Sequence, residues 1–171
     1  MEHLVLVAYA TKYGSTEETA RIVAAVLHAN GLPVDVCAVN DVRGFVHYSA
    51  VVLCGALYMG RLHRNARRFL LAWREQLSRI PVALLVAGPV NMDPKDWAGA
   101  EQQLNKELAR LDPWFLPIDQ KIVGGKWDPA KLRFPLSLIL RKIPANDARD
   151  WAAIRAWANN LAGKLQPAWA T

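Results

Sequence analysis

Short apolar runs alternate along the chain with longer segments in which apolar residues recur every three or four positions. The runs have the length of β-strands and cover residues 4–9, 34–39, 50–55 and 82–87, with a weaker fifth run at 120–124. They are apolar at nearly every position rather than at every second one. This pattern predicts strands that are covered on both faces of a sheet.

The segments between these runs predict helices over residues 16–30, 65–77, 96–111 and 147–165. Ser15 followed by Glu18 predicts a capping box at the start of the first helix. Residues 40–49 have room for a short helix only. Strands that alternate with helices form right-handed crossover units. We therefore expect an α/β three-layer sandwich with a five-stranded parallel sheet in the order 2-1-3-4-5.

Residues 128–144 interrupt this alternation, at a place where an α/β fold needs only a few connecting residues. Pro135 and Pro144 argue against one long regular helix in this segment. We expect a single domain over residues 1–171 that carries an apolar, basic insertion at about 128–144. The apolar residues of the insertion are Leu132, Phe134, Leu136, Leu138, Ile139, Leu140 and Ile143, and its basic residues are Lys131, Arg133, Arg141 and Lys142.

The composition is that of a folded protein without membrane-spanning segments. Of the 171 residues, 53% are hydrophobic and 21% are charged. No run of 18 residues is free of charge, so no transmembrane helix is expected. The chain enters its first apolar run without a preceding basic region, which argues against a signal peptide. Cys37 and Cys54 lie in strand-like runs and predict buried free thiols. These features predict a cytoplasmic protein.

The formal net charge of +6 is unevenly distributed. One basic stretch contains Arg61, Arg64, Arg67, Arg68, Arg74 and Arg79, and a second contains Lys121, Lys126, Lys131, Arg133, Arg141 and Lys142. Such stretches attract anions, such as acidic proteins, anionic lipid, nucleic acid or a carboxylated substrate. A solvated basic surface with no dedicated partner is the alternative.

The strongest chemical signal lies between the first strand and the first helix. Amides at a helix start lack partners, and the helix dipole adds positive partial charge there. Gly14 lets the backbone curve closely around a phosphate, and nearby hydroxyls add donors. A P-loop and a dinucleotide-binding motif are both absent. We predict a phosphate site here, with a plain helix cap as the alternative. The site comprises Thr11, Lys12, Tyr13, Gly14, Ser15 and Thr16.

The pattern Thr-x-x-Gly-x-Thr, formed by Thr11, Gly14 and Thr16 directly after the first strand, resembles the FMN phosphate loop of the flavodoxin family. The resemblance covers nearly the whole chain. It implies a flavodoxin-like three-layer sandwich with FMN as cofactor. It also implies that the loops after the third and fourth strands contact the isoalloxazine ring.

In the first of these loops, Ala56 is small enough for a flat ring to approach, Tyr58 can stack on the ring, and Gly60 permits an unusual turn. In the second, backbone amides can bond the pyrimidine edge. Family members typically carry an aromatic stacker there, whereas this chain has none before Trp97, which leaves one ring face open. Packing of Tyr58 on the core edge is the alternative. The predicted ring contacts are Ala56, Leu57, Tyr58, Met59, Gly60, Gly88, Pro89, Val90, Asn91 and Met92.

His63 is the histidine nearest to these loops. In its protonated form it can favour a reduced, anionic flavin or hold a carboxylate, and a surface role is the alternative. The other histidines and the two cysteines do not form a metal-binding constellation, so no metal site is predicted. The sequence assigns no catalytic residue.

The basic charge, the loop Gly-Ala-x-Tyr-x-Gly-x-x-His at residues 55–63 and the insertion separate this chain from acidic electron carriers. Together they resemble the menaquinone-dependent protoporphyrinogen oxidases. That resemblance implies an oxidoreductase that passes reducing equivalents from a tetrapyrrole through FMN to a quinone. Arg61, Arg64 and Arg141 would bind propionates. The insertion would contact anionic lipid at the inner face of the membrane.

Two alternatives remain open at this stage. The first is a soluble electron carrier whose redox partner is an acidic protein. The second is a non-enzymatic domain that has kept the fold and lost FMN. We predict no nucleic-acid partner. The apolar insertion and the seven tryptophans leave room for a homodimer surface.

Overall fold

A parallel sheet forms the centre of the computed structural model, which describes residues 4–111 and 114–166. The strand order is β2-β1-β3-β5-β6, and a short strand β4 pairs with β3 outside this path. Counting the parallel strands alone gives the order 2-1-3-4-5, so the predicted α/β three-layer sandwich is confirmed. The strands are β1 (Leu4–Tyr9), β2 (Val34–Ala38), β3 (Tyr48–Tyr58), β4 (Arg61–Leu62), β5 (Val82–Ala87) and β6 (Asp119–Val123).

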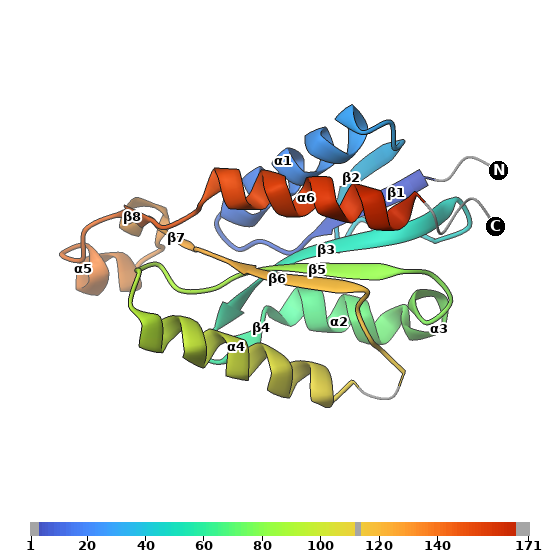
Figure 1. The fold of residues 1–171 in the computed structure, drawn as a ribbon. Helices are drawn as coiled ribbons and strands as arrows, with labels where there is room; N and C mark the ends of the chain where they lie inside the picture. Colours follow the sequence, from blue (N-terminus) through green and yellow to red (C-terminus); the bar gives the residue numbers. More distant parts are fainter. Residues whose placement is uncertain (1–3, 112–113, 167–171) are drawn as a thin grey trace.

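Helices cover both faces of this sheet (Figure 1). The helices α1 (Ser15–Ala29) and α6 (Trp151–Leu165) lie on one face. The other face carries α2 (Arg64–Ala72), α3 (Arg74–Leu77) and α4 (Pro94–Ala109). Residues 40–49 contain no helix, and the predicted helix over 65–77 is divided into α2 and α3.

The division falls at Trp73, whose backbone departs from helical geometry with φ −106° and ψ 21°. Its ring packs against Phe45, with 5.0 Å between the ring centroids. The predicted helix over 147–165 begins only at Trp151. Asp147 belongs to a strand instead, and the Asp150 side chain caps the helix by accepting a hydrogen bond from the Ala153 amide.

The core consists of two layers of apolar side chains, one on each side of the sheet. Val5 and Val7 of β1 belong to the layer beneath α1 and α6. Leu6 and Ala8 belong to the layer beneath α2 and α4. All four side chains are fully buried. A strand that is buried on both faces has no solvent-facing position, which explains the unbroken apolar run in the sequence.

The strand β3 is longer than the predicted run at 50–55, and this changes the loop that follows it. The chain continues as a strand to Tyr58, turns at Met59 and Gly60, and returns as β4. Met59 has φ 48° and Gly60 has φ 79°, and positive φ at both turn positions is typical of a tight hairpin turn. The predicted ring loop is therefore a β-hairpin, and the unusual turn predicted at Gly60 is confirmed.

The predicted insertion forms a small element of its own beyond the end of the sheet (Figure 1). Its stem is an antiparallel pair of two-residue strands, β7 (Lys126–Trp127) and β8 (Asn146–Asp147). Between them lie the 3₁₀ helix η1 (Pro129–Lys131) and the short helix α5 (Leu136–Leu140). Neither helix contains a buried residue.

Both cysteines are free thiols, as predicted. Cys54 is buried, and burial raises the pKa of its thiol to about 12, whereas Cys37 is only partly buried. In residues 4–111 and 114–166, no helix is long and apolar enough to cross a membrane. Within the same described residues, no group of three histidine, cysteine or acidic side chains is arranged to hold a metal ion.

Candidate functional site

The carboxyl ends of β1, β3, β5 and β6 meet at one edge of the sheet, and a cavity of about 190 Å³ opens there. This edge is where open α/β sheets bind ligands, because the strand order reverses between β1 and β3. The cavity is lined by Tyr13, Ser15, Ala56, Leu57, Tyr58, Ala87, Gly88, Val90, Gly125, Lys126, Trp127, Asp128 and Lys131.

The loop from Thr11 to Ser15 leads from β1 into α1 at this cavity. Gly14 is the N-cap residue and has the left-handed conformation, with φ 89° and ψ −13°. Its amide donates a hydrogen bond to the Thr11 hydroxyl oxygen at 2.8 Å, which closes the loop. Among the described residues, no side chain caps this helix. The first amides of α1 therefore keep their capacity to bind an anion.

The predicted capping box is wrong, because Glu18 is engaged elsewhere. Its carboxylate accepts a hydrogen bond from Arg149 at 2.7 Å and lies 3.8 Å from the Lys126 ammonium. The hydrogen bond from Arg149 holds the pKa of Glu18 below its ordinary value. Glu17 pairs with Arg21 at 2.7 Å. Both acidic residues in the first turn are thus paired with cations, which reduces their repulsion of an anion at the helix start.

Two glycine-containing loops close the floor of the cavity by backbone hydrogen bonds. The Gly88 amide donates to the Val123 carbonyl at 2.8 Å, and the Gly125 amide donates to the Pro89 carbonyl at 2.7 Å. A β-carbon on Gly125 would stand 2.6 Å from the Gly88 carbonyl oxygen, so only glycine permits this approach. The loops after β5 and β6 are therefore held together as one surface.

Trp127 brings an aromatic ring to the cavity from the stem of the insertion. Its indole Nε1 is buried, and no hydrogen-bond partner is found for it among the described residues. A buried N–H without an acceptor is costly, and a ligand that accepts a hydrogen bond would remove this cost. Trp127 thus supplies an aromatic side chain that the loop after β5 lacks.

The family model for a flavodoxin domain matches residues 6–150. The chain belongs to the flavodoxin family. No curated protein matches this flavodoxin-family chain in a sequence search. Its similarity to solved structures concerns the fold.

Several solved structures share the fold of this chain along nearly its whole length. The flavodoxin of Streptococcus pneumonia TIGR4 is 18% identical, with a TM-score of 0.57, and the match covers 94% of this chain and 99% of that one. Oxidised flavodoxin 1 from Bacillus cereus is 13% identical, with a TM-score of 0.55 and coverage of 96% and 97%. The rubredoxin oxygen:oxidoreductase of Desulfovibrio gigas is 14% identical, with a TM-score of 0.60, and the match covers 98% of this chain but 37% of that one.

The residues that the sequence predicts for this flavodoxin-family site divide into three groups. Tyr13, Ser15, Ala56, Leu57, Tyr58, Gly88 and Val90 line the cavity. Thr11, Lys12, Gly14 and Thr16 belong to the loop that borders it, and Thr16 is buried. Outside the lining are Met59, Gly60, Pro89, Asn91 and Met92.

Local contacts explain why three of the predicted ring residues lie outside the cavity. Met59 occupies the tip of the hairpin and is fully exposed, and a β-carbon on Gly60 would stand 3.5 Å from Gln103 of α4. Asn91 shapes the turn before α4, since its side chain accepts from the Asp93 amide at 3.0 Å. Its carbonyl accepts from Trp97 Nε1 at 2.9 Å.

Sequence reasoning missed the cavity residues from Gly125 to Lys131. The sheet order contained a usable signal, because the carboxyl end of the fifth parallel strand must reach the same edge as the others. The pair Gly124-Gly125 followed by Trp127 combines small and aromatic residues, as does the loop after the third strand. The stem that folds this segment back over the cavity has no comparable local pattern.

His63 caps α2, which favours a neutral imidazole over the protonated role that the sequence left open. Its Nδ1 accepts a hydrogen bond from the Asn65 amide at 3.2 Å. The ring also packs edge-on against Tyr58, with 5.7 Å between centroids. Desolvation, assisted by the nearby Lys12 charge, lowers the pKa of His63 from its ordinary value of 6.5. The imidazole is therefore neutral near pH 7, and it supports the hairpin that carries Tyr58.

Proposed function

We propose that this chain is an FMN-binding redox protein. The observation that carries the proposal is the start of α1, which lacks a side-chain cap and opens beside a cavity at the reversal of strand order. The phosphate group of FMN would bind at the loop from Thr11 to Thr16. The isoalloxazine ring would occupy the cavity lined by Tyr58 and Trp127.

The residues present fit this cofactor in chemistry as well as position. The amides at the start of α1 and the hydroxyls of Thr11 and Ser15 are donors suited to a phosphate dianion. Tyr58 is partly exposed at the cavity, so its ring is accessible for stacking. The carbonyl oxygens and ring nitrogens of a flavin are acceptors of the kind that the buried indole N–H of Trp127 lacks.

Bound FMN would supply the redox chemistry, since flavins exchange reducing equivalents in steps of one or two electrons. The chain's own residues would hold and shield it. The joined loops at Gly88 and Gly125 form an uncharged backbone surface on one side. Burial raises the pKa of the Tyr58 hydroxyl, so this side chain stays neutral beside the ring. No side chain in the cavity is assigned a proton-transfer role.

At a finer level, we propose an oxidoreductase of the protoporphyrinogen dehydrogenase type, with a quinone as electron acceptor. Exposed apolar side chains of the insertion support a lipophilic reactant, and Phe134 and Ile139 are 78% and 69% exposed. Arg61 is the backbone partner of Tyr58 in the β3–β4 ladder, and its guanidinium would bind a carboxylated substrate. Arg64 begins α2 next to it.

The same apolar surface supports a peripheral membrane contact at the cytoplasmic face. Exposed Phe134 and Ile139 lie within a few residues of the basic side chains of Arg133, Arg141 and Lys142. Apolar side chains that enter the interface, together with cations that attract anionic headgroups, are the usual basis of such binding. A protein-serving electron carrier needs the basic charge but not the exposed apolar residues.

The test begins with flavin extraction from purified protein, followed by turnover assays. We expect one FMN per chain and menaquinone-analogue reduction that depends on protoporphyrinogen. Reduction by a reductase without small-molecule turnover would identify the electron carrier instead. A colourless protein that takes up no added FMN would reject both redox functions.

A second assay tests the membrane contact with vesicles that contain anionic lipid. The double variant F134S/I139S should bind these vesicles about tenfold more weakly, because two apolar side chains no longer enter the interface. Leu116→Ser is the matched control, since Leu116 is 87% exposed outside the insertion. Equal binding by the double variant and the wild type would contradict the membrane contact.

A further inference from the structure

A lysine of the insertion contacts the loop at the start of α1. The Nζ atom of Lys131 donates a hydrogen bond to the Tyr13 carbonyl at 3.1 Å, across 118 positions of sequence. The same Nζ lies 3.9 Å from where a β-carbon on Gly14 would stand. Lys131 also lines the cavity together with Tyr13 and Ser15. A cation from a distant segment therefore stands beside the uncapped helix start.

The backbone that carries Lys131 is fixed by its own hydrogen bonds. Lys131 ends η1, and the Asp128 side chain caps this turn by accepting from the Ala130 amide at 3.0 Å. The Lys131 amide donates to the Asp128 carbonyl at 3.2 Å. The stem that precedes η1 pairs with β8. The ammonium group is thus directed to the loop by an ordered turn.

The other cations near the helix start already have charged or aromatic partners. Arg149 forms ion pairs with Glu18 and Asp147 at 2.7 and 2.6 Å, and Lys126 lies 3.8 Å from Glu18. Lys12 lies over the Tyr13 ring at 5.1 Å. Among the ion pairs of the described residues, none includes Lys131, whose one hydrogen-bond acceptor is a neutral carbonyl.

We propose that Lys131 is a phosphate-binding residue that the insertion contributes to the cofactor site. The inference rests on the proposed FMN function and adds a charged side chain to the groups that bind the phosphate. The backbone amides and hydroxyls of the loop bind the phosphate as neutral donors, and Lys131 adds a charge-assisted hydrogen bond. Binding of the cofactor therefore depends on the position of the insertion.

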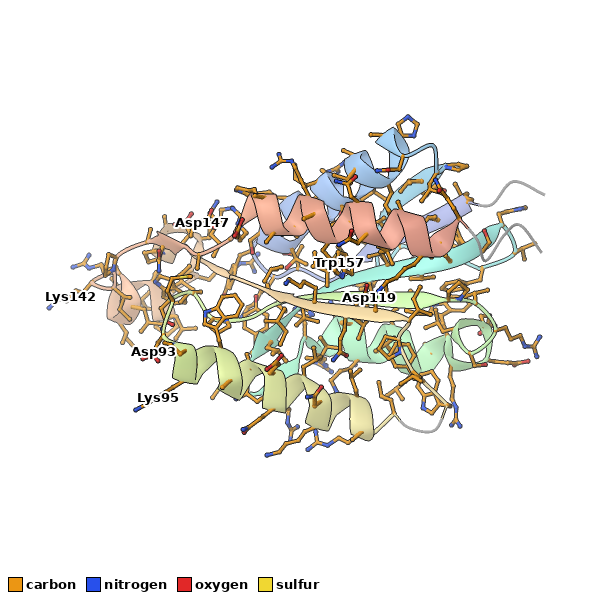
Figure 2. All side chains as sticks on the ribbon, viewed as in Figure 1. Asp93, Lys95, Asp119, Lys142, Asp147 and Trp157 are labelled. Carbon is orange, nitrogen blue, oxygen red and sulfur yellow. The ribbon has the colours of Figure 1, made fainter. Side chains whose placement is uncertain are left out.

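The experiment compares FMN with riboflavin, which has the same ring and lacks the phosphate. Flavin-free wild type, K131M and K142M are titrated with each flavin, and binding is followed by quenching of flavin fluorescence. Lys142 is the matched control, because it is an exposed lysine of the same insertion that points away from the body of the molecule (Figure 2).

We expect K131M to bind FMN about five- to tenfold more weakly, as for loss of one exposed charge-assisted hydrogen bond. Riboflavin affinity should be unchanged, and K142M should match the wild type with both flavins. The FMN affinity of the wild type should also fall more steeply with added potassium chloride than that of K131M.

Equal FMN affinities of K131M and the wild type would overturn this inference and leave the proposed function standing. Equal losses for FMN and riboflavin would also overturn it, because the effect would then concern the fold of the cavity. A wild-type protein that binds neither flavin would overturn the proposed function together with this inference. Thermal unfolding of K131M shows whether the variant is folded, as expected for a substitution at an exposed side chain.

Discussion

The strand β5 and the helix α5 are both short apolar segments, yet their environments differ completely. β5 reads Val-Ala-Leu-Leu-Val-Ala, and Leu84 at its centre is fully buried. α5 reads Leu-Ser-Leu-Ile-Leu, and Ile139 near its centre is 69% exposed. The comparison teaches that apolar sequence alone does not define the core, because burial depends on what neighbouring elements cover.

The neighbours of the two segments explain the difference. β5 pairs with β3 on one side and β6 on the other, and helices cover both of its faces. α5 is joined to the body by a stem of two-residue strands. A helix of five residues has little surface to bury by itself. Exposed apolar side chains at such a place indicate an interaction surface rather than a core.

The largest predicted effect is the difference in stability between an alanine variant of β5 and an alanine variant of α5. Leu84→Ala should lower the free energy of unfolding by about 3 kcal/mol, because it leaves a cavity between packed layers. Ile139→Ala should change it by less than about 0.5 kcal/mol. Urea unfolding of both variants measures the two values. Similar losses in the two variants would mean that α5 belongs to the core.

A smaller effect is expected at the junction between body and insertion. The side chain of Arg149 is 4% exposed and joins Glu18 of α1 to Asp147 of β8. Asp147 lies where the insertion returns to α6 (Figure 2). Arg149→Met should lower the free energy of unfolding by about 2 kcal/mol, because both carboxylates lose their partner. The loss is limited because water partly solvates both carboxylates. It should also speed proteolytic cleavage within residues 128–144.

The matched control at this junction is Arg155→Met, because Arg155 is exposed on α6 and, within residues 4–111 and 114–166, donates only to the Trp151 carbonyl at 3.5 Å. It should leave both the stability and the cleavage rate unchanged. Cleavage of the insertion at the wild-type rate in Arg149→Met would show that the stem holds the insertion without this ion-pair network.

The smallest predicted effect concerns pH and the cap of α2. Because the folded-state pKa of His63 is lowered from 6.5, its neutral form stabilises the fold above that pH. This contribution is lost as pH falls from 6.5 through the folded-state pKa, where the imidazole gains a proton and Nδ1 can no longer accept from Asn65.

Stability curves of the wild type and H63N between about pH 5 and 8 check this prediction, since this range spans the ordinary histidine pKa. An asparagine at this position can keep the capping acceptor and does not titrate, so H63N should lose less stability as pH falls. H63A should lower the free energy of unfolding by about 1 kcal/mol at neutral pH, because alanine removes the capping acceptor. Parallel curves for H63N and the wild type would contradict the assigned cap.

The sheet was predictable because each central strand carries its own signal. Val5 to Ala8 is apolar on both faces, and the loop at Gly14 follows directly from the strand end. The predicted capping box is wrong because a long-range contact replaces the local one. Ser15 and Glu18 match a local motif, but Arg149, far away in sequence, binds Glu18 instead.

The rest of the site depends on long-range contacts that leave no periodic pattern. Trp127 belongs to a strand of two residues, too short for an alternation to be visible. Lys131 reaches Tyr13 only because the stem folds the insertion back toward α1. The hairpin at Met59 was missed because its strand continues to Tyr58, past the end of the predicted run at 50–55.

The central claim is that the amino end of α1 binds the phosphate of FMN. The most direct measurement follows the backbone amide NMR signals of isotope-labelled protein during titration with FMN and with riboflavin. We predict that FMN shifts the amides from Gly14 to Glu17 most strongly, while riboflavin shifts the Trp127 indole N–H and leaves those amides in place. Amides of this loop that stay unmoved by saturating FMN would contradict the account.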